Sequence, residues 1–344
     1  MLVRVDAKIR VSCALTRAAH TSMVSIFAHT DGRTETVDRI DPAWLDPASS
    51  VKLWVDLAGA TPEELTMLSD VFHFHPLAVE DAVANVHHPK IESYDGYLYL
   101  ILHGIDYKKS ETAFATHDID FFLGATYLVT VHDGQTRSAG SIREMCSRNE
   151  QVLGEGPAAL MHRIIDQMVD SYRPEVEELE KWLDELEERV FAAPTKDLVR
   201  EILDVKRDVT GLRRIATPQR DAIGRLARRE FPIISDELAY RFRDVYDNLV
   251  RIADEALIFQ DRVTSILEAH FSNVSYRLNE VMKVLTVITV IFMPLTLVAG
   301  IYGMNMHLPG VGNAEDPRMF WQLILGMIAG SCIMLWFFRR RGWI

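Results

Sequence analysis

Two apolar segments near the C-terminal end dominate the hydrophobic pattern of this chain. Residues 284–301 and 319–338 contain no Asp, Glu, Lys or Arg. Each approaches the ~20 residues that a helix needs to cross the hydrocarbon core of a membrane. A buried hairpin in a soluble core is the alternative, and it fits these lengths less well. The pattern predicts two membrane spans joined by an extracytoplasmic loop at residues 302–318.

An uninterrupted helical pattern leads into the first apolar segment. Between residues 236 and 301 the only proline is Pro294, and the only glycine is Gly300. At ~1.5 Å per residue such a helix is roughly 100 Å long, too long for a globular domain. We therefore predict a stalk helix over residues 236–301 that crosses the membrane from about residue 281 to residue 301.

Residues 23–135 alternate strand-like and helix-like patterns, which predicts a cytosolic α/β domain. One helix is expected to start at Pro62, where Thr61 and Glu64 form a capping box, and another at Pro76. The basic residues 1–22 lack the apolar run of a signal peptide and are read as a lead-in. The predicted strands cover residues 24–28, 51–57, 90–94, 97–106, 116–123 and 126–132.

Residues 136–235 carry a helical pattern with segregated charge. Between residues 175 and 190, leucines recur every three or four positions and acidic residues fill the other face. Residues 206–229 are instead rich in Lys and Arg. This pattern predicts a cytosolic helical hairpin whose antiparallel helices are held together partly by opposite charge.

Charge orients the spans and limits the partners. Basic residues precede the first span and form the tail at residues 339–344, whereas the loop carries Glu315, Asp316 and one base, Arg318. The positive-inside rule then places both termini in the cytosol. A formal charge of -12 argues against a nucleic-acid partner and suits a protein that handles cations. The three cysteines are too far apart in sequence to indicate a disulfide framework or a thiolate metal site.

A polar stripe runs along the first span. Its members recur every three or four residues, so they share one helix face. Packing of small residues between membrane helices is the plain alternative. Because two helices cannot enclose a pore, a conducting chain would need several copies around one axis. The stripe consists of Asn279, Met282, Thr286, Thr289, Met293, Thr296 and Gly300.

The chemistry of this stripe favours a hydrated ion. Mg²⁺ sheds its water reluctantly, and hydroxyl and amide oxygens can hydrogen-bond to that water without replacing it. Zn²⁺ prefers Cys or His, and the stripe contains neither. The stripe therefore indicates passage of an ion with its water shell.

Several separated motifs resemble the CorA-type magnesium and cobalt transporters, the two-span family with a GMN motif. The resemblance covers nearly the whole chain from residue 50 onward. It is carried by NEVMKVLT at residues 279–286, FMPLT at 292–296, GIYGMN at 300–305, VED at 79–81, NVH at 85–87, PK at 89–90, RIATPQR at 214–220 and FRDVYD at 242–247.

The resemblance implies a funnel-shaped homopentamer with stalk helices around the pore. Gly303, Met304 and Asn305 would form the outer selectivity ring, and Glu268 an acidic ring deeper in the stalk. Polar pore-lining positions would be Asn279, Thr286, Thr296 and Gly300, with apolar constrictions at Met282, Leu285 and Met293.

The resemblance also implies that the protein senses cytosolic Mg²⁺ between adjacent subunits. Asp81 and Asp244 match one such site, and Glu80 and Asp166 match a second. Carboxylates that face each other across an interface repel, and a divalent ion bridges them. Loss of the ion would loosen the subunits and open the pore.

The loop after Asn305 departs from the usual family pattern. Its Pro-Gly pair at residues 309–310 is similar to the zinc-transporting ZntB branch, although that branch lacks the Met of the GMN run. Glu315 and Asp316 would still form an outer acidic ring that concentrates cations. The departure leaves the preferred ion open.

We expect a divalent-cation transporter of the bacterial inner membrane rather than an enzyme. Mg²⁺ is expected as both cargo and regulator, with Co²⁺ and Ni²⁺ as further cargo and no organic cofactor. Its partners would be copies of itself, the lipid bilayer and divalent cations. The alternatives are a Zn²⁺ transporter coupled to protons, a membrane-anchored receptor or scaffold, and a metal-dependent hydrolase built on His73 and His75.

Overall fold

The chain divides into a mixed α/β unit and a helical unit. The computed structural model describes residues 23–84, 88–108, 113–134, 137–148, 151–192, 197–304 and 317–343. The first unit comprises Met1–Glu185 and Arg200–Thr264, and the second comprises Leu186–Val199 and Ser265–Ile344. Each unit is described separately below.

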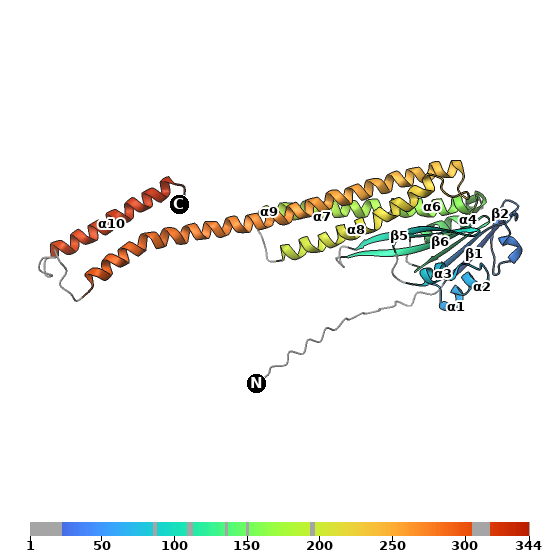
Figure 1. The fold of residues 1–344 in the computed structure, drawn as a ribbon, viewed down its shortest axis with the longest axis horizontal. Helices are drawn as coiled ribbons and strands as arrows, with labels where there is room; N and C mark the ends of the chain where they lie inside the picture. The colour runs from blue at the N-terminus through green and yellow to red at the C-terminus, as the bar shows by residue number, and fades with distance from the viewer. Residues whose placement is uncertain are drawn as a thin grey trace, which may run out of the picture. The chain divides into compact units, whose positions relative to one another are not determined.

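A seven-stranded sheet forms the centre of the first unit (Figure 1). Its strands are β1 (Met23–Thr30), β2 (Arg33–Thr36), β3 (Lys52–Ala58), β4 (Lys90–Tyr94), β5 (Tyr97–Lys108), β6 (Ala113–Gly124) and β7 (Tyr127–His132). Their order is β2-β1-β3-β7-β6-β5-β4. β3 and β7 pair in parallel and the other neighbours pair antiparallel.

All six predicted strands are present, and one strand was missed. β2 forms a hairpin with β1, closed by Asp31 and Gly32, whose φ angles are 53° and 81°. An Asp-Gly pair is a strong hairpin signal because both residues adopt positive φ. The flanking RTET sequence of β2 is too polar to read as a strand, so pairing with β1 rather than composition defines it.

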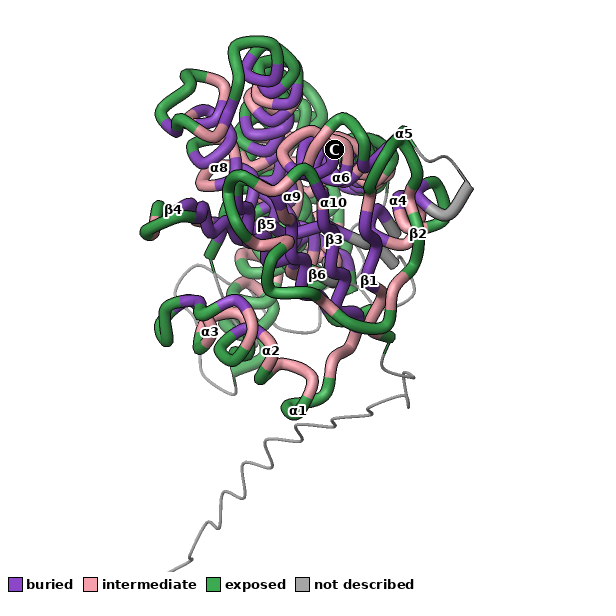
Figure 2. The backbone as a smooth tube through the Cα atoms, turned by 90° about the vertical axis from the view of Figure 1, so that its right-hand side faces the viewer, coloured by how far each residue is buried: buried purple, intermediate pink, exposed green. Residues whose placement is uncertain are grey.

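Helices cover both faces of the sheet. On β3, Leu53, Val55 and Leu57 pack into one apolar cluster with Phe72 and Phe74, while alternate residues face the other side. Figure 2 shows the helices α1–α3 on one side of the strands and α4–α6 on the other. The helices are α1 (Pro62–Leu65), α2 (Met67–Asp70), α3 (Pro76–Val83), α4 (Arg137–Arg148), α5 (Gln151–Gly154) and α6 (Pro157–Asp170), with a short 3₁₀ turn η1 at Pro42–Leu45.

The helix starts follow the capping signals in the sequence. Thr61 accepts a hydrogen bond from the backbone N–H of Glu64, and Glu64 accepts one in return from the N–H of Thr61. The predicted capping box is therefore confirmed, with Pro62 in the first turn. Pro76 likewise begins α3, whose N-cap is His75.

Three long helices follow: α7 (Tyr172–Ala192), α8 (Leu198–Ala227) and α9 (Asp236–Tyr302). A buried polar network fastens α7 and α8 to β5 of the sheet. The side chain of Gln219 on α8 accepts a hydrogen bond from the backbone N–H of His103 at 2.7 Å and donates one to the Tyr172 hydroxyl at 3.1 Å. Tyr172 in turn donates to the His103 carbonyl at 2.5 Å. Gln219 is fully buried, so these two hydrogen bonds compensate its amide for the loss of water.

Two ion pairs link α7 to α9. Asp184 lies 2.6 Å from Arg262, and Arg173 lies 3.3 Å from Glu255. The charge pattern predicts pairing between α7 and α8, whereas these ion pairs join α7 to α9, a contact that was not predicted.

The helical unit contains two helices that are long and apolar enough to cross a membrane. They are the C-terminal part of α9 and α10 (Pro317–Arg340), where residues 320–340 meet this test. Only 6% of the most apolar stretch of α9 and 0% of that of α10 is buried. A soluble protein rarely exposes so much contiguous apolar surface. An α/β domain, a long helix and two apolar helices are the architecture that the sequence predicts.

Candidate functional site

The predicted stripe lies on the exposed face of α9. Met282 is 56% exposed, Leu285 54% and Met293 66%. The shielded positions lie on the opposite side of the helix, where Val287 is buried and Ile291 is half-buried. Ile291 follows Met282 by about two and a half turns, and the half turn places the two side chains on opposite faces. Asn279, Thr289, Thr296 and Gly300 are exposed with the methionines, and Thr286 is half-buried. The polar face therefore points away from the only shielded side of this helix segment.

The threonines of the stripe are oriented by their own helix. Each hydroxyl donates to the carbonyl four residues earlier: Thr286 at 2.7 Å, Thr289 at 2.8 Å and Thr296 at 2.8 Å. With its hydrogen committed, the hydroxyl oxygen presents lone pairs to the surroundings. Water bound to a cation directs its hydrogens outward, so these oxygens are suited to accept from it.

A shallow groove runs along the stripe near the C-terminal end of α9. It is lined by Thr289, Met293, Thr296, Gly300 and Met304, among others. Pro294 lies within this stretch and has no N–H to donate to the preceding turn. Glu268 is exposed further along the same helix and, at almost four turns from Met282, shares the stripe's face.

Gly303 sits where α9 ends. Its N–H donates to the Ala299 carbonyl at 2.9 Å, and the N–H of Met304 donates to the Ile301 carbonyl at 3.3 Å. A Cβ at residue 303 would lie 3.0 Å from the Ala299 oxygen, so a larger residue would displace this turn. The predicted residues Asn305, Glu315 and Asp316 lie outside the described part of the chain.

The predicted sensing carboxylates occupy two places in the first unit. Glu80 and Asp81 lie on α3, the former exposed and the latter half-buried. Asp166 on α6 and exposed Asp244 on α9 form the other group. Burial raises the pKa of Asp166, the nearby His162 lowers it, and the negative charges of Asp170 and Asp244 raise it further.

Within one chain, Asp166 is close enough to Asp244 to feel its charge. The pairs that the resemblance implies, Asp81 with Asp244 and Glu80 with Asp166, join adjacent subunits and stay predictions. Among the described residues, no group of three or more His, Cys, Asp or Glu side chains is arranged to hold a metal ion. The oxygen donors fit Mg²⁺, which needs only one or two carboxylates and keeps its remaining water.

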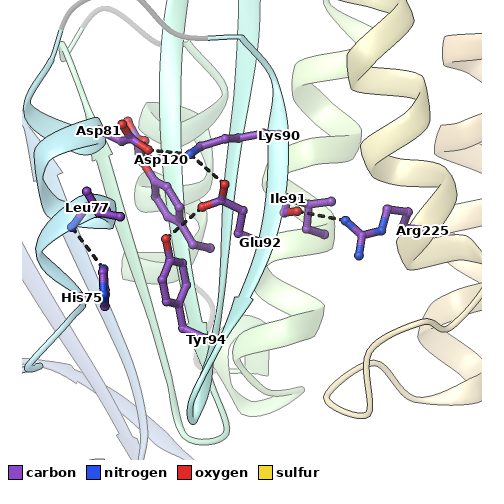
Figure 3. Close-up of polar contacts among 10 residues, drawn as sticks. His75, Leu77, Asp81, Lys90, Ile91, Glu92, Tyr94, Asp120 and Arg225 are labelled. Carbon is purple, nitrogen blue, oxygen red and sulfur yellow. Dashed lines mark hydrogen bonds and ion pairs between the residues drawn. The ribbon is translucent and has the colours of Figure 1, made fainter.

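Lys90 forms an ion cluster beside α3 that was not predicted from the sequence (Figure 3). Its ammonium lies 2.5 Å from Asp81 Oδ2 and 3.1 Å from Glu92 Oε1. Lys90, Glu92 and Tyr94 alternate along β4, so all three point to one face of this edge strand. Tyr94 donates its hydroxyl hydrogen to Glu92 at 2.9 Å. The alternation of these residues was the available signal.

A buried carboxyl completes this cluster. Asp120 on β6 accepts a hydrogen bond from the Tyr99 hydroxyl at 2.6 Å and is 5% exposed. Burial raises the pKa of Asp120 to about 7; Tyr99 opposes the shift, the charges of Asp118 and Asp81 add to it, and Lys90 opposes it. Burial lowers the pKa of Lys90, but its hydrogen bonds to Asp81 and Glu92 outweigh this and raise it overall.

A family comparison identifies the architecture. The model described as CorA-like Mg2+ transporter protein matches residues 50–340. The chain belongs to the CorA-like Mg²⁺ transporter family. The cobalt/magnesium transport protein CorA of Thermotoga maritima is 32% identical over 306 residues, covering 86% of this chain and 84% of that protein.

Solved structures of CorA relatives share this fold. The complete CorA magnesium transporter of Methanocaldococcus jannaschii aligns with a TM-score of 0.80 at 22% identity, covering 94% of this chain and 100% of that one. The cytoplasmic domain of ZntB from Vibrio parahaemolyticus aligns with a TM-score of 0.59 at 17% identity, covering 74% of this chain and 98% of that one. At these identities the likeness concerns the fold alone.

The raised pKa of Asp120 predicts that stability depends on pH. The folded state binds the proton of Asp120 more tightly than the unfolded state does. The contribution of Asp120 to stability is therefore fully present below its unfolded pKa of about 4, and it is lost as the pH rises through its folded pKa of about 7. The loss is on the order of 2–4 kcal/mol. Thermal unfolding of the purified full chain in EDTA, from pH 5 to pH 8, measures it.

Asp120→Asn should remove most of that dependence, because an amide stays neutral and still accepts from Tyr99. Asp70→Asn, at an exposed aspartate in α2, serves as the control and should follow the wild type. Equal pH slopes for Asp120→Asn and wild type would show that Asp120 ionises normally.

Proposed function

We propose that this CorA-family chain transports Mg²⁺ across the membrane, with Co²⁺ and Ni²⁺ as further cargo, through a pore built from several copies of α9. The polar stripe on the exposed face of a membrane-length helix is the observation that carries the proposal. An anchor of a receptor or scaffold needs only apolar side chains, whereas this helix presents three hydroxyl oxygens on one face.

A homopentamer in the inner membrane, with both termini in the cytosol, is the assembly we propose. One chain supplies a single pore-lining helix, so closure around a path requires rotational symmetry between identical copies. The number five comes from the family resemblance. The basic residues Arg339, Arg340 and Arg341 at the C-terminal end of α10 support a cytosolic C-terminus.

The pore would pass ions that keep their water. Thr289 and Thr296 would accept hydrogen bonds from that water, while Met282, Leu285 and Met293 would form apolar constrictions. The Asn305 amide would receive the ion at the outer end, with Glu315 and Asp316 concentrating cations in front of it. A carboxylate-free span holds a divalent ion loosely enough to release it.

Zn²⁺ transport is the weaker alternative. The likeness to ZntB concerns its cytoplasmic domain, at 17% sequence identity, and covers 74% of this chain. The stripe provides hydroxyl, amide and thioether groups rather than the imidazole or thiolate that Zn²⁺ favours. Mg²⁺ is therefore the cargo that we propose.

Flux into proteoliposomes tests this function. Wild type should carry Mg²⁺, Co²⁺ and Ni²⁺ at fixed pH without a proton gradient. Asn305→Ala should lower Mg²⁺ flux about tenfold or more, because every copy loses hydrogen bonds worth ~0.5–1.5 kcal/mol each. Asn313→Ala, at another asparagine of the same loop, should retain flux.

Flux that is indifferent to Asn305→Ala would contradict the selectivity ring. Zn²⁺ uptake driven by a proton gradient, with little Mg²⁺ uptake, would favour the alternative instead. Absence of flux for all four ions would favour a receptor or scaffold.

Cytosolic Mg²⁺ is proposed to close the pore by binding carboxylates between subunits. Substituting both Asp81→Asn and Asp244→Asn removes two of these ligands, so transport should persist at an internal Mg²⁺ concentration that closes the wild type. Asp254→Asn, at an exposed aspartate elsewhere on α9, is the matched control. Flux against internal Mg²⁺ is the measurement, and unchanged shut-off in the double variant would remove Asp81 and Asp244 from sensing.

A further inference from the structure

We propose that Lys90 is a tethered cation that occupies Asp81 in the absence of Mg²⁺ and must be displaced when Mg²⁺ binds there. Lys90 would thereby set the Mg²⁺ concentration at which the sensing site fills. This inference rests on the proposed sensing role of Asp81. It gives a function to the Pro89-Lys90 motif, which the ion path and the sensing carboxylates leave unexplained.

Geometry places the ammonium on the ligand itself. Lys90 Nζ lies 2.5 Å from Asp81 Oδ2, so the ammonium contacts this oxygen directly. A hydrated ion approaching the same oxygen would overlap the ammonium. Both side chains are about one-third exposed, at 32% and 30%, so solvent and ions can reach the pair.

Local charge explains why a cation is needed here. The carboxylates of Asp81 and Glu92 both contact the Lys90 ammonium, and Figure 3 shows the carboxyl group of Asp120 close to them. Without a positive charge between them, Asp81 and Glu92 would repel each other. The ammonium therefore stabilises the empty site in the manner of the divalent ion, with half its charge.

A second position is available to the displaced ammonium. Glu92 already lies 3.1 Å from Lys90 Nζ and is held in place by the Tyr94 hydroxyl at 2.9 Å. The ring of Tyr99 lies beneath the ammonium, with its centroid 5.6 Å away, and can stabilise a cation. Lysine has a flexible stem, so a small movement exchanges Asp81 for these partners. Glu92 thus lowers the free energy needed to move the Lys90 ammonium away from Asp81.

The competition predicts opposite effects for two neutral substitutions. Lys90→Met keeps the length of the side chain but removes the competitor, so Mg²⁺ should fill the site at a concentration about 3- to 10-fold lower. Glu92→Gln removes the second partner, so Lys90 should hold Asp81 more firmly and the required concentration should rise. Lys90→Arg keeps the charge and should stay near the wild type or above it.

The purified full chain is digested with trypsin at a series of Mg²⁺ concentrations. The concentration that gives half-maximal protection, the protection midpoint, measures how readily the site fills and does not depend on transport. Lys206→Met makes the same change in charge at an exposed lysine on α8 and should leave the midpoint unchanged. Thermal unfolding in EDTA, measured on every variant, checks that the folds are comparable.

Three outcomes would overturn the inference. A midpoint that is unchanged or higher in Lys90→Met, while Asp81→Asn abolishes protection, leaves the sensing role intact and refutes the competition. A fall in Lys90→Arg equal to that in Lys90→Met refutes the role of charge. A protection midpoint that is unaffected by Asp81→Asn refutes the sensing role and, with it, the role of Lys90.

Discussion

The exposed apolar surface of the last third of α9 is the constraint on which the rest of the structure depends. Apart from the turn at Pro294, the backbone groups of this segment can be satisfied within the helix, but its apolar side chains are exposed on every side except one. Lipid can cover valine and isoleucine, yet it offers nothing to a row of hydroxyl lone pairs. Copies of the same helix around a water-filled path, as we propose, would give the hydroxyl oxygens of Thr289 and Thr296 a polar neighbour.

The first unit, which contains the sheet, holds its charged residues in defined positions. Gln219 ties α8 and α7 to β5 through buried hydrogen bonds, so these two helices have a fixed relation to the sheet. Asp81 and Asp120 would destabilise their surroundings if left alone. Lys90 offsets Asp81, and burial leaves Asp120 neutral over part of the physiological range.

Patterns that report local structure were predictable from the sequence. The capping box at Thr61, the strand alternation and the long run of α9 each depend on residues close in the chain. β2 was missed because its residues are polar and form a strand through their pairing with β1, which the local sequence does not reveal. The contact of Asp184 with Arg262 was missed because it joins residues far apart in sequence.

The candidate sites divide in the same way. Helical periodicity sufficed to gather the stripe on one face of α9, because the period is fixed by the backbone. The cluster around Lys90 joins α3, β4 and β6, and no sequence period relates these elements. The roles of Asn305, Glu80 and Asp244 stay predictions that rest on the resemblance to CorA transporters.

Accessibility of single cysteines tests the central claim most directly, namely that the stripe lines a water-filled ion path. In a chain whose own cysteines are replaced, Thr296→Cys and Ile291→Cys place a thiol on opposite sides of the same helix. A membrane-impermeant, hydrophilic thiol reagent should block Mg²⁺ flux through Thr296→Cys proteoliposomes and leave Ile291→Cys unaffected. Block at Ile291→Cys with none at Thr296→Cys would contradict the account.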